Sequence, residues 1–189
     1  MYSGFFHAGK EITMKTERNV NVITDLNGKK VVVINDIYFY GKQHIKWDDV
    51  EQYLKRYIDE FYEVAETKDI IYIGKDLPDE YTSSKYTRNL RGILAKIKAN
   101  AVSGIPEMIE IAERKRYQEN MDKKHKNEAK HGWYRYDTRF ALPVYNNRKE
   151  LVRHNYFQAE LIIRHASDGK MYLYDILNIK KKRQSNPLE

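Results

Sequence analysis

The chain has 189 residues, of which 41% are hydrophobic and 13% aromatic, enough to build the core of one domain. Disordered chains lack such a supply of aromatic and β-branched residues, and no apolar run approaches the length of a membrane span. Cysteine is absent, which excludes disulfides, thiolate metal sites and a cysteine nucleophile, and is typical of a cytoplasmic protein.

The formal net charge of +7 is unevenly distributed along the chain. Residues 1–84 carry 11 Lys and Arg against 15 Asp and Glu, residues 85–139 carry 14 against 7, and residues 140–189 carry 9 against 5. A basic surface attracts polyanions, most often nucleic acid or anionic lipid. The same charge also suits a merely solvated surface, so both interpretations stay open.

The first half of the sequence predicts a hairpin, a helix and a strand. Asn19–Thr24 alternates polar and apolar residues, Asn27-Gly28 suits a tight turn, and Lys29–Tyr40 is rich in β-formers, which together predict a β-hairpin. Apolar residues at three- and four-residue spacing predict a helix over Trp47–Ala65. Asp69–Gly74 is expected to be a short buried strand.

Two further helices are expected after the polar stretch Lys75–Thr87. The first spans Arg88–Ala101, and its expected apolar side consists of Leu90, Ile93, Leu94, Ile97 and Ala101. The second has Pro106 in its first turn, where the missing N–H matters little. From Glu113 to Lys130 the sequence is strongly polar and predicts a projecting helix end or a mobile arm.

The last part of the chain predicts strands over Tyr134–Tyr145, Tyr156–Arg164 and Met171–Ile179, with a hairpin turn at Asp168-Gly169. We therefore expect an α+β fold whose N-terminal helices pack on a mainly antiparallel sheet that closes with a C-terminal β-hairpin. The expected organisation is an N-terminal arm (1–18), one domain (19–180) and a basic tail (181–189). Met14 could be an alternative start and Leu188-Glu189 a cloning remnant, so no prediction depends on the residues at either terminus.

Several kinds of site do not fit the sequence. The glycines are isolated, so no phosphate-binding loop is present, and no two histidines share a helical i, i+4 spacing for zinc. Asp48 and Asp49 would point about 100° apart on a helix, which disfavours a two-metal site there. We therefore expect no metal or cofactor. Cleavage of RNA through its own 2′-hydroxyl stays possible, because it requires only a base, an acid and cations.

Residues Lys123–Arg139 combine histidine, basic and aromatic side chains more densely than any other segment of the chain. The candidate catalytic residues are Lys124, His125, Tyr134, Thr138 and Arg139. The candidate nucleic-acid-binding residues are Arg114, Arg116, Lys123, Lys126, Lys130, His131, Trp133 and Arg135. Neighbouring lysines disfavour imidazolium at His125 and would leave it a neutral base near pH 7.

Strand geometry separates these candidates. Tyr134 and Thr138 should face one side of a strand and Arg135 and Arg139 the other, so the two sets share a pocket only if a bulge intervenes. Core packing on one face and a solvated ladder on the other is the alternative interpretation.

His165, at the end of a hairpin strand, could be oriented by Asp175 in the next strand, although an ordinary hairpin pair explains the same spacing.

Five ordered motifs resemble a family of domains found in phage and mobile-element polyproteins. The motifs are residues 79–86 (DEYTSSKY), residues 105–109 (IPEMI), Lys124-His125, residues 132–135 (GWYR) and residues 172–180 (YLYDILNIK). This family is grouped with the barnase, EndoU, colicin and RelE-type ribonuclease fold, and the likeness extends from Asn19 to Lys180.

The resemblance implies helices packed against a four- or five-stranded antiparallel sheet and a metal-independent, toxin-like ribonuclease activity. It assigns a role directly only to Lys124-His125. The sequence shows no second histidine that pairs with His125 across the sheet, which leaves the acid–base pair incomplete.

Three functions stay open from the sequence. The first is a metal-independent endoribonuclease of a phage or mobile element, with RNA as the favoured partner and an immunity or host-element protein as a second one. The second is a nucleic-acid-binding module without catalysis. The third is a protein-interaction module whose charge serves solubility alone.

Overall fold

The computed structural model describes residues 18–41, 44–121 and 126–183. Its strands are β1 (Val20–Thr24), β2 (Lys30–Ile34), β3 (Phe61–Glu63), β4 (Ile70–Tyr72), β5 (Glu113–Gln118), β6 (Trp133–Tyr145), β7 (Leu151–His165) and β8 (Met171–Lys182). Its helices are α2 (Trp47–Leu54), α3 (Leu77–Ser83), α4 (Lys85–Asn89), α5 (Gly92–Ala101) and α6 (Ile105–Glu110), with the 3₁₀ turns η1 (Lys55–Tyr57) and η2 (Val102–Gly104).

The strands form one eight-stranded sheet in the order β1-β2-β6-β7-β8-β4-β3, with β5 paired to the N-terminal half of β6. The β2–β6 and β4–β8 pairings are parallel, with Val32 opposite Phe140 and Ile71 opposite Met171. Helical segments separate both pairs of strands in the sequence, and such long connections permit parallel neighbours. The α+β class is confirmed, but the sheet is mixed, which corrects the expected mainly antiparallel sheet of four or five strands.

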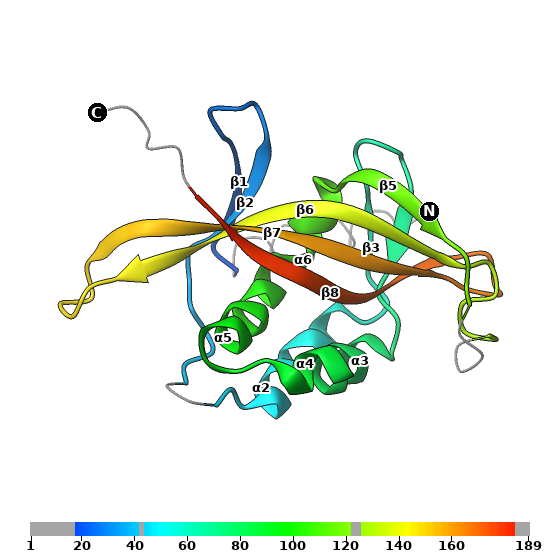
Figure 1. Cartoon of the computed structure of the whole chain (residues 1–189), viewed down its shortest axis with the longest axis horizontal. Coiled ribbons are helices and arrows are strands. Elements are labelled where there is room, and N and C mark those ends of the chain that lie inside the picture. The colour runs from blue at the N-terminus through cyan, green and yellow to red at the C-terminus, as the bar shows by residue number, and fades with distance from the viewer. Residues whose placement is uncertain (1–17, 42–43, 122–125, 184–189) are drawn as a thin grey trace, which may run out of the picture.

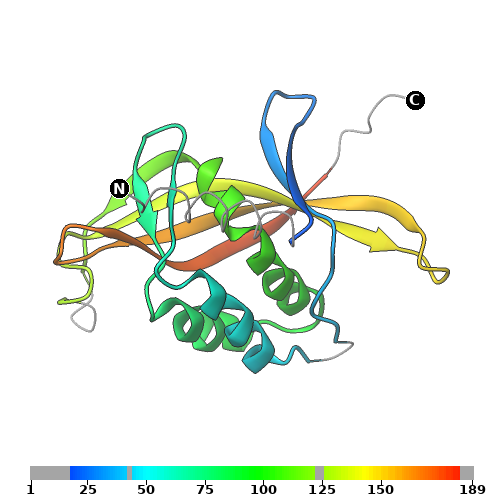
Figure 2. The same ribbon diagram turned by 180° about the vertical axis from the view of Figure 1, so that it is seen from behind.

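The helices and the β1–β2 hairpin lie on opposite sides of the long strands β6, β7 and β8 (Figure 1). Helices α2 to α5 cover one face, and the hairpin projects from the other, as the view from behind also shows (Figure 2). The main core, which includes Tyr57 and Phe140, lies on the helix face. A smaller cluster of Val31, Val33 and Ala141 lies on the opposite face. No helix within the described residues is long and apolar enough to cross a membrane.

The two predicted hairpins are confirmed. In the first, β1 and β2 are antiparallel with Thr24 opposite Lys30, and Gly28 in the turn has a φ of 74°. In the second, β7 and β8 are antiparallel and are joined through a turn in which Gly169 has a φ of 81°. Both glycines adopt a backbone conformation that a Cβ atom would disfavour.

The predicted helix over Trp47–Ala65 is too long. Helix α2 ends at Leu54, one 3₁₀ turn follows, and residues 61–63 form β3. Although the apolar spacing continues past the turn, Asp59 adopts a φ of 69°, which a helix does not accommodate. Phe61 then lies opposite Tyr72 in the sheet instead of extending the apolar side of the helix.

The middle helices also differ from the prediction. The polar stretch Lys75–Thr87 contains α3 and most of α4, and α5 begins only at Gly92. Ile93 and Leu94 are 69% and 45% exposed, whereas Lys98 is fully buried. A charged residue therefore occupies the core side of α5. The helix expected at Pro106 is confirmed as α6.

The polar segment after α6 is a strand rather than a helix end or a mobile arm. Residues 113–118 form β5 and pair with β6, with Tyr117 opposite Tyr134. Arg114 has a φ of 58°, and the register shifts between Glu113 and Arg116, which masks the alternation that would reveal a strand.

The folded domain extends slightly beyond both boundaries of the expected domain, residues 19–180. Arg18, the last residue of the expected N-terminal arm, is buried and donates hydrogen bonds of 2.7 Å to both carboxylate oxygens of Glu107 in α6. Strand β8 continues to Lys182, so the first residues of the expected tail extend the sheet.

A buried ion pair joins the helix layer to the last strand. Nζ of Lys98 in α5 lies 2.6 Å from Oδ1 of Asp175 in β8, and it also donates to the hydroxyl of Thr87 at 2.6 Å. Ser84 donates to the second oxygen of Asp175 at 3.1 Å, and the backbone N–H of Ile176 donates to the first. Burial raises the pKa of Asp175 and lowers that of Lys98, each against the opposing effect of the partner charge.

Removing one partner of this pair should leave an uncompensated buried charge. We expect Lys98→Met and Asp175→Ala each to lower the free energy of unfolding by about 3–5 kcal/mol, and the double variant to lose clearly less than the sum. Urea unfolding measures all three. Lys55→Met, which removes the partly exposed pair with Glu51 in α2, is the control and should cost at most about 1 kcal/mol. A cost below about 1 kcal/mol for either buried single variant would contradict this role.

Candidate functional site

The candidate residues before β6 are placed only in part. Lys123, Lys124 and His125 lie outside the described residues, so their roles stay predictions. Lys126 and Lys130 are exposed in the turn that leads into β6.

The expected separation of the β6 side chains is confirmed. Tyr134 and Thr138 face the helix side, whereas Arg135 and Arg139 face the opposite, outer side, so the structure does not bring the candidate catalytic set together. Thr138 is fully buried and donates a 2.9 Å hydrogen bond to the carbonyl of Met108, which places it in the core.

The arginines on the outer face are matched by carboxylates. Arg116 contacts Asp137 at 2.8 Å and Glu160 at 3.2 Å, and Arg135 contacts Glu160 at 2.9 Å. Arg114 lies 3.4 Å from Asp137. These three candidate nucleic-acid-binding residues therefore form an ion-pair network across β5, β6 and β7 rather than a set of unpaired cations.

The remaining aromatic candidate, Trp133, is also anchored within the protein. Its Nε1 donates to Oδ1 of Asn120 at 3.2 Å, and its ring meets the ring of Tyr174 edge-on at 5.0 Å. These contacts position the start of β6 against β8.

On the helix face, a hollow of about 360 Å³ opens where the first part of β6 meets the end of β7 and the start of β8. Its lining includes Tyr134, His165, Lys115, Lys170 and Asp69. Two cationic side chains, a phenol and an imidazole thus share one hollow. This is the kind of residue set that a metal-free phosphodiester cleavage site requires.

The backbone at the end of the β6–β7 ladder brings two histidines together beside this hollow. The N–H of His131 donates to the carbonyl of His165 at 3.1 Å, and the N–H of His165 donates to the carbonyl of Gly132 at 3.0 Å. Gly132 has a φ of 94°, a conformation that glycine adopts without strain. The imidazole rings of His131 and His165 lie 5.0 Å apart, and the ring of Tyr134 lies 5.8 Å from that of His165.

The two imidazoles differ in exposure. His131 is exposed, whereas His165 is half-buried, and its Nδ1 has no hydrogen-bond partner among the described residues. Because this Nδ1 is buried, proton exchange between His165 and a substrate would have to use Nε2. The orientation of His165 by Asp175, which the sequence suggested, does not occur, because Asp175 binds Lys98.

Asp69, which directly precedes β4, joins several side chains at the hollow. Its Oδ2 accepts hydrogen bonds from Thr67 at 2.6 Å and from Tyr136 at 2.5 Å, and it lies 2.8 Å from Nζ of Lys115. Burial by itself would raise the pKa of Asp69, but these donors outweigh burial and lower it below its ordinary value. Lys115 in turn lies over the ring of Tyr134, 4.4 Å from its centre.

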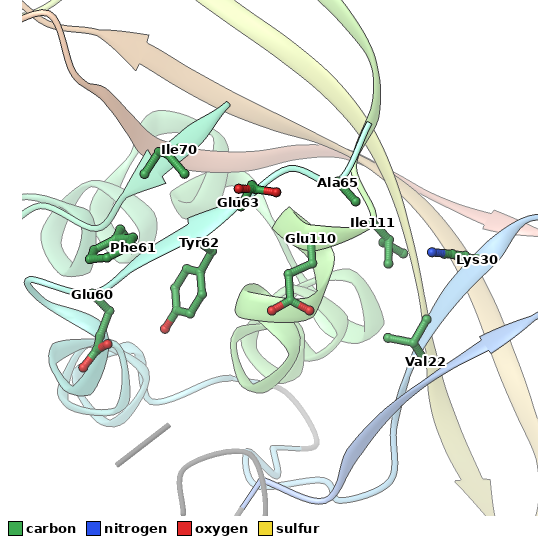
Figure 3. A pocket seen from close by; sticks show the side chains of 10 residues that line it. All are labelled: Val22, Lys30, Glu60, Phe61, Tyr62, Glu63, Ala65, Ile70, Glu110 and Ile111. Carbon is green, nitrogen blue, oxygen red and sulfur yellow. The ribbon is translucent and has the colours of Figure 1, made fainter. Parts of the chain in front are cut away.

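A separate cavity of about 640 Å³ between β3, α6 and the β1–β2 hairpin has a different character (Figure 3). Glu60, Glu63 and Glu110 line it together with a single cation, Lys30. Three carboxylates in one cavity repel a polyanion, so this cavity is unsuited to nucleic acid.

No cluster of three or more metal-ligating side chains occurs within the part of the chain that the structure describes. Comparison with known proteins found no matching family model, no similar curated protein and no similar solved structure. The resemblance to the phage-associated ribonuclease group therefore stays a prediction from the sequence.

The charge of Asp69 should stabilise the fold in a pH-dependent manner. We expect Asp69→Asn to lower the free energy of unfolding by about 1–2 kcal/mol at pH 7, because the variant weakens the bonds to Lys115 and Tyr136. Since the pKa of Asp69 is lower in the folded than in the unfolded chain, its contribution is fully present above about pH 4. It disappears as the pH falls through the folded-state pKa. Urea unfolding at pH 7 and near pH 2 measures the difference, and an equal difference at both values would contradict the assignment.

Proposed function

We propose that the protein is a metal-independent endoribonuclease whose catalytic groups are His131 and His165. The observation that carries this proposal is the pair of imidazoles 5.0 Å apart beside a hollow that also contains Lys115, Lys170 and Tyr134. The sequence offered no histidine partner for His125, which lies outside the described residues, and the proposed pair is instead His131 with His165. Tyr134 keeps the catalytic or positioning role expected from the sequence, and His125 stays a further candidate.

The proposed reaction uses the 2′-hydroxyl of RNA as the nucleophile. One imidazole takes the proton from this hydroxyl, O2′ forms a bond to phosphorus, and the bond from phosphorus to O5′ breaks. The other imidazole gives a proton to the leaving O5′. The products are a 2′,3′-cyclic phosphate and a 5′-hydroxyl.

Lys115 and Lys170 are the groups that would stabilise the charge of the phosphorane. Lys115 comes from β5 and Lys170 from the turn between β7 and β8, and Asp69 holds Lys115 in place at 2.8 Å. Positioned cations stabilise a transition state more effectively than mobile ones, because little reorganisation accompanies the reaction. The resemblance adds the proposed context, which is a toxin-like domain of a phage or mobile element.

Single histidine variants test this assignment. We expect His131→Ala and His165→Ala each to lower the rate of RNA cleavage in excess EDTA by about 10²- to 10⁴-fold, because each removes one proton-transfer group. His44→Ala is the matched control, since His44 is exposed in the segment before α2, and it should retain the wild-type rate. The readout is the initial rate on a labelled single-stranded RNA, with folding of each variant checked by circular dichroism.

Two results would contradict the assignment. Wild-type rates in both folded histidine variants would remove the catalytic pair. RNA binding without any cleavage by the wild-type protein would favour the non-catalytic binding module.

A further inference from the structure

A second hollow lies on the outer face of the sheet, between the turn of the β1–β2 hairpin and strands β7 and β8. Its volume is about 470 Å³. Its lining includes the cationic and polar side chains of Lys29, Arg139, Tyr156, Gln158, Lys182 and Arg183. Except for Arg139, none of these belongs to the candidate residues that the sequence indicated. We refer to this hollow as the outer groove.

The outer groove is built on the small apolar cluster of the outer face. Ile23 from β1 and Tyr156 from β7 pack against Val31, Val33 and Ala141, which fixes the hairpin where it rises from the sheet. The parallel pairing of β2 with β6 sets the distance between the hairpin and the long strands. The groove is therefore formed by the paired strands of the sheet together with the turn of the β1–β2 hairpin.

The charge of the outer groove is strongly positive. Asp25 is the one carboxylate in its lining, and its Oδ1 accepts the backbone N–H groups of Asn27 and Lys29 at 2.9 Å, so it serves the turn. Glu113, outside the lining, contacts Arg139 at 2.5 Å and Lys29 at 3.4 Å. Two cations thus share one carboxylate and keep a surplus of positive charge.

Lys182 and Arg183 form no ion pair with any described residue. A neighbouring hollow of about 550 Å³ shares them and Tyr156, and adds Arg153 and Lys181. The positive surface therefore extends beyond the outer groove along the start of β7 and the end of β8. Such an extended track of cations suits a chain of phosphates better than a single small anion.

We propose that the outer groove binds the sugar–phosphate backbone of single-stranded RNA. Lys29, Lys182 and Arg183 would contact phosphates, and Tyr156 offers a ring on which a base can stack. A single strand fits the observations because a double helix is too wide to enter a hollow of this size.

This binding does not require the proposed catalysis. Tyr156 and His165 are nine residues apart on β7, which corresponds to about 30 Å along the strand, and the two hollows lie on opposite faces. The outer groove would thus hold a part of the RNA remote from the bond that is cut.

Charge reversal tests the proposal. The probe is a fluorescent single-stranded RNA of about ten nucleotides with 2′-O-methyl groups, which cannot react through its 2′-oxygens. Fluorescence anisotropy measures its dissociation constant at several salt concentrations. The double variant Lys182→Glu, Arg183→Glu should bind about 10-fold or more weakly at low salt, with a salt slope reduced by about 1.4, because two phosphate contacts are lost.

The matched control is Lys85→Glu, Arg88→Glu in α4, which changes the net charge by the same amount on the helix side of the molecule. Its affinity should stay within about 2-fold of the wild-type value at moderate salt. An equal loss in both double variants, or no loss in the groove variant, would overturn the proposal. Tighter binding of a labelled oligoglutamate than of the RNA would assign the groove to an acidic protein partner instead.

The outcome is separable from the catalytic proposal. Cleavage of a dinucleotide, which is too short to reach the outer groove, reports on the histidine pair alone. If the wild-type protein cleaves the dinucleotide but binds the longer RNA only weakly, the proposal for the outer groove is wrong and that for the histidine pair stands. If it binds the RNA through the groove but cleaves no dinucleotide, the proposal for the histidine pair is wrong and that for the groove stands.

Discussion

The carboxylate of Asp69 is the point at which the two edges of the curled sheet meet. It precedes β4 near one edge, and its partners Lys115 and Tyr136 lie on β5 and β6 near the other. Together with the pairing of β5 with β6, this contact holds Lys115 over Tyr134 and fixes a wall of the hollow beside His165. A partly buried carboxylate that accepts several hydrogen bonds is stable because its donors compensate for lost hydration. One acidic residue thus determines where Lys115, one of the two cations of the candidate site, can lie.

Strand alternation then divides the chemistry of the protein between two faces. On the helix face, the start of β6 and the end of β7 bring aromatic, imidazole and ammonium groups to the edge of the core. On the outer face, the arginines of β5 and β6 neutralise Asp137 and Glu160, whereas Lys182 and Arg183, farther along, form no ion pair with any described residue. Catalysis and binding of the RNA sugar–phosphate backbone are therefore proposed at different places, although the sequence placed most candidate residues for both in one segment.

The sequence predicted those elements whose signals are local. Asn27-Gly28, Asp168-Gly169 and Pro106 each determine the backbone within a few residues, and the two hairpins and α6 follow from them. It missed β5, because a bulge near Arg114 breaks the alternation, and it overextended the helix that ends at Leu54. The parallel pairings and the meeting of His131 with His165 depend on contacts between distant parts of the chain. No periodicity within a segment reports them, although the two histidines flank consecutive long strands and a hairpin register would have suggested the pair.

We propose that the paired imidazoles of His131 and His165 cut RNA through its own 2′-hydroxyl. The chemical identity of the product ends distinguishes this reaction from other routes of cleavage. The measurement is end-group analysis by mass spectrometry after the purified protein acts on single-stranded RNA in excess EDTA. We expect 2′,3′-cyclic phosphate and 5′-hydroxyl ends, and no cut at a position that carries a 2′-deoxy sugar. Products with 5′-phosphate and 3′-hydroxyl ends, or cleavage of the 2′-deoxy position at an equal rate, would contradict it.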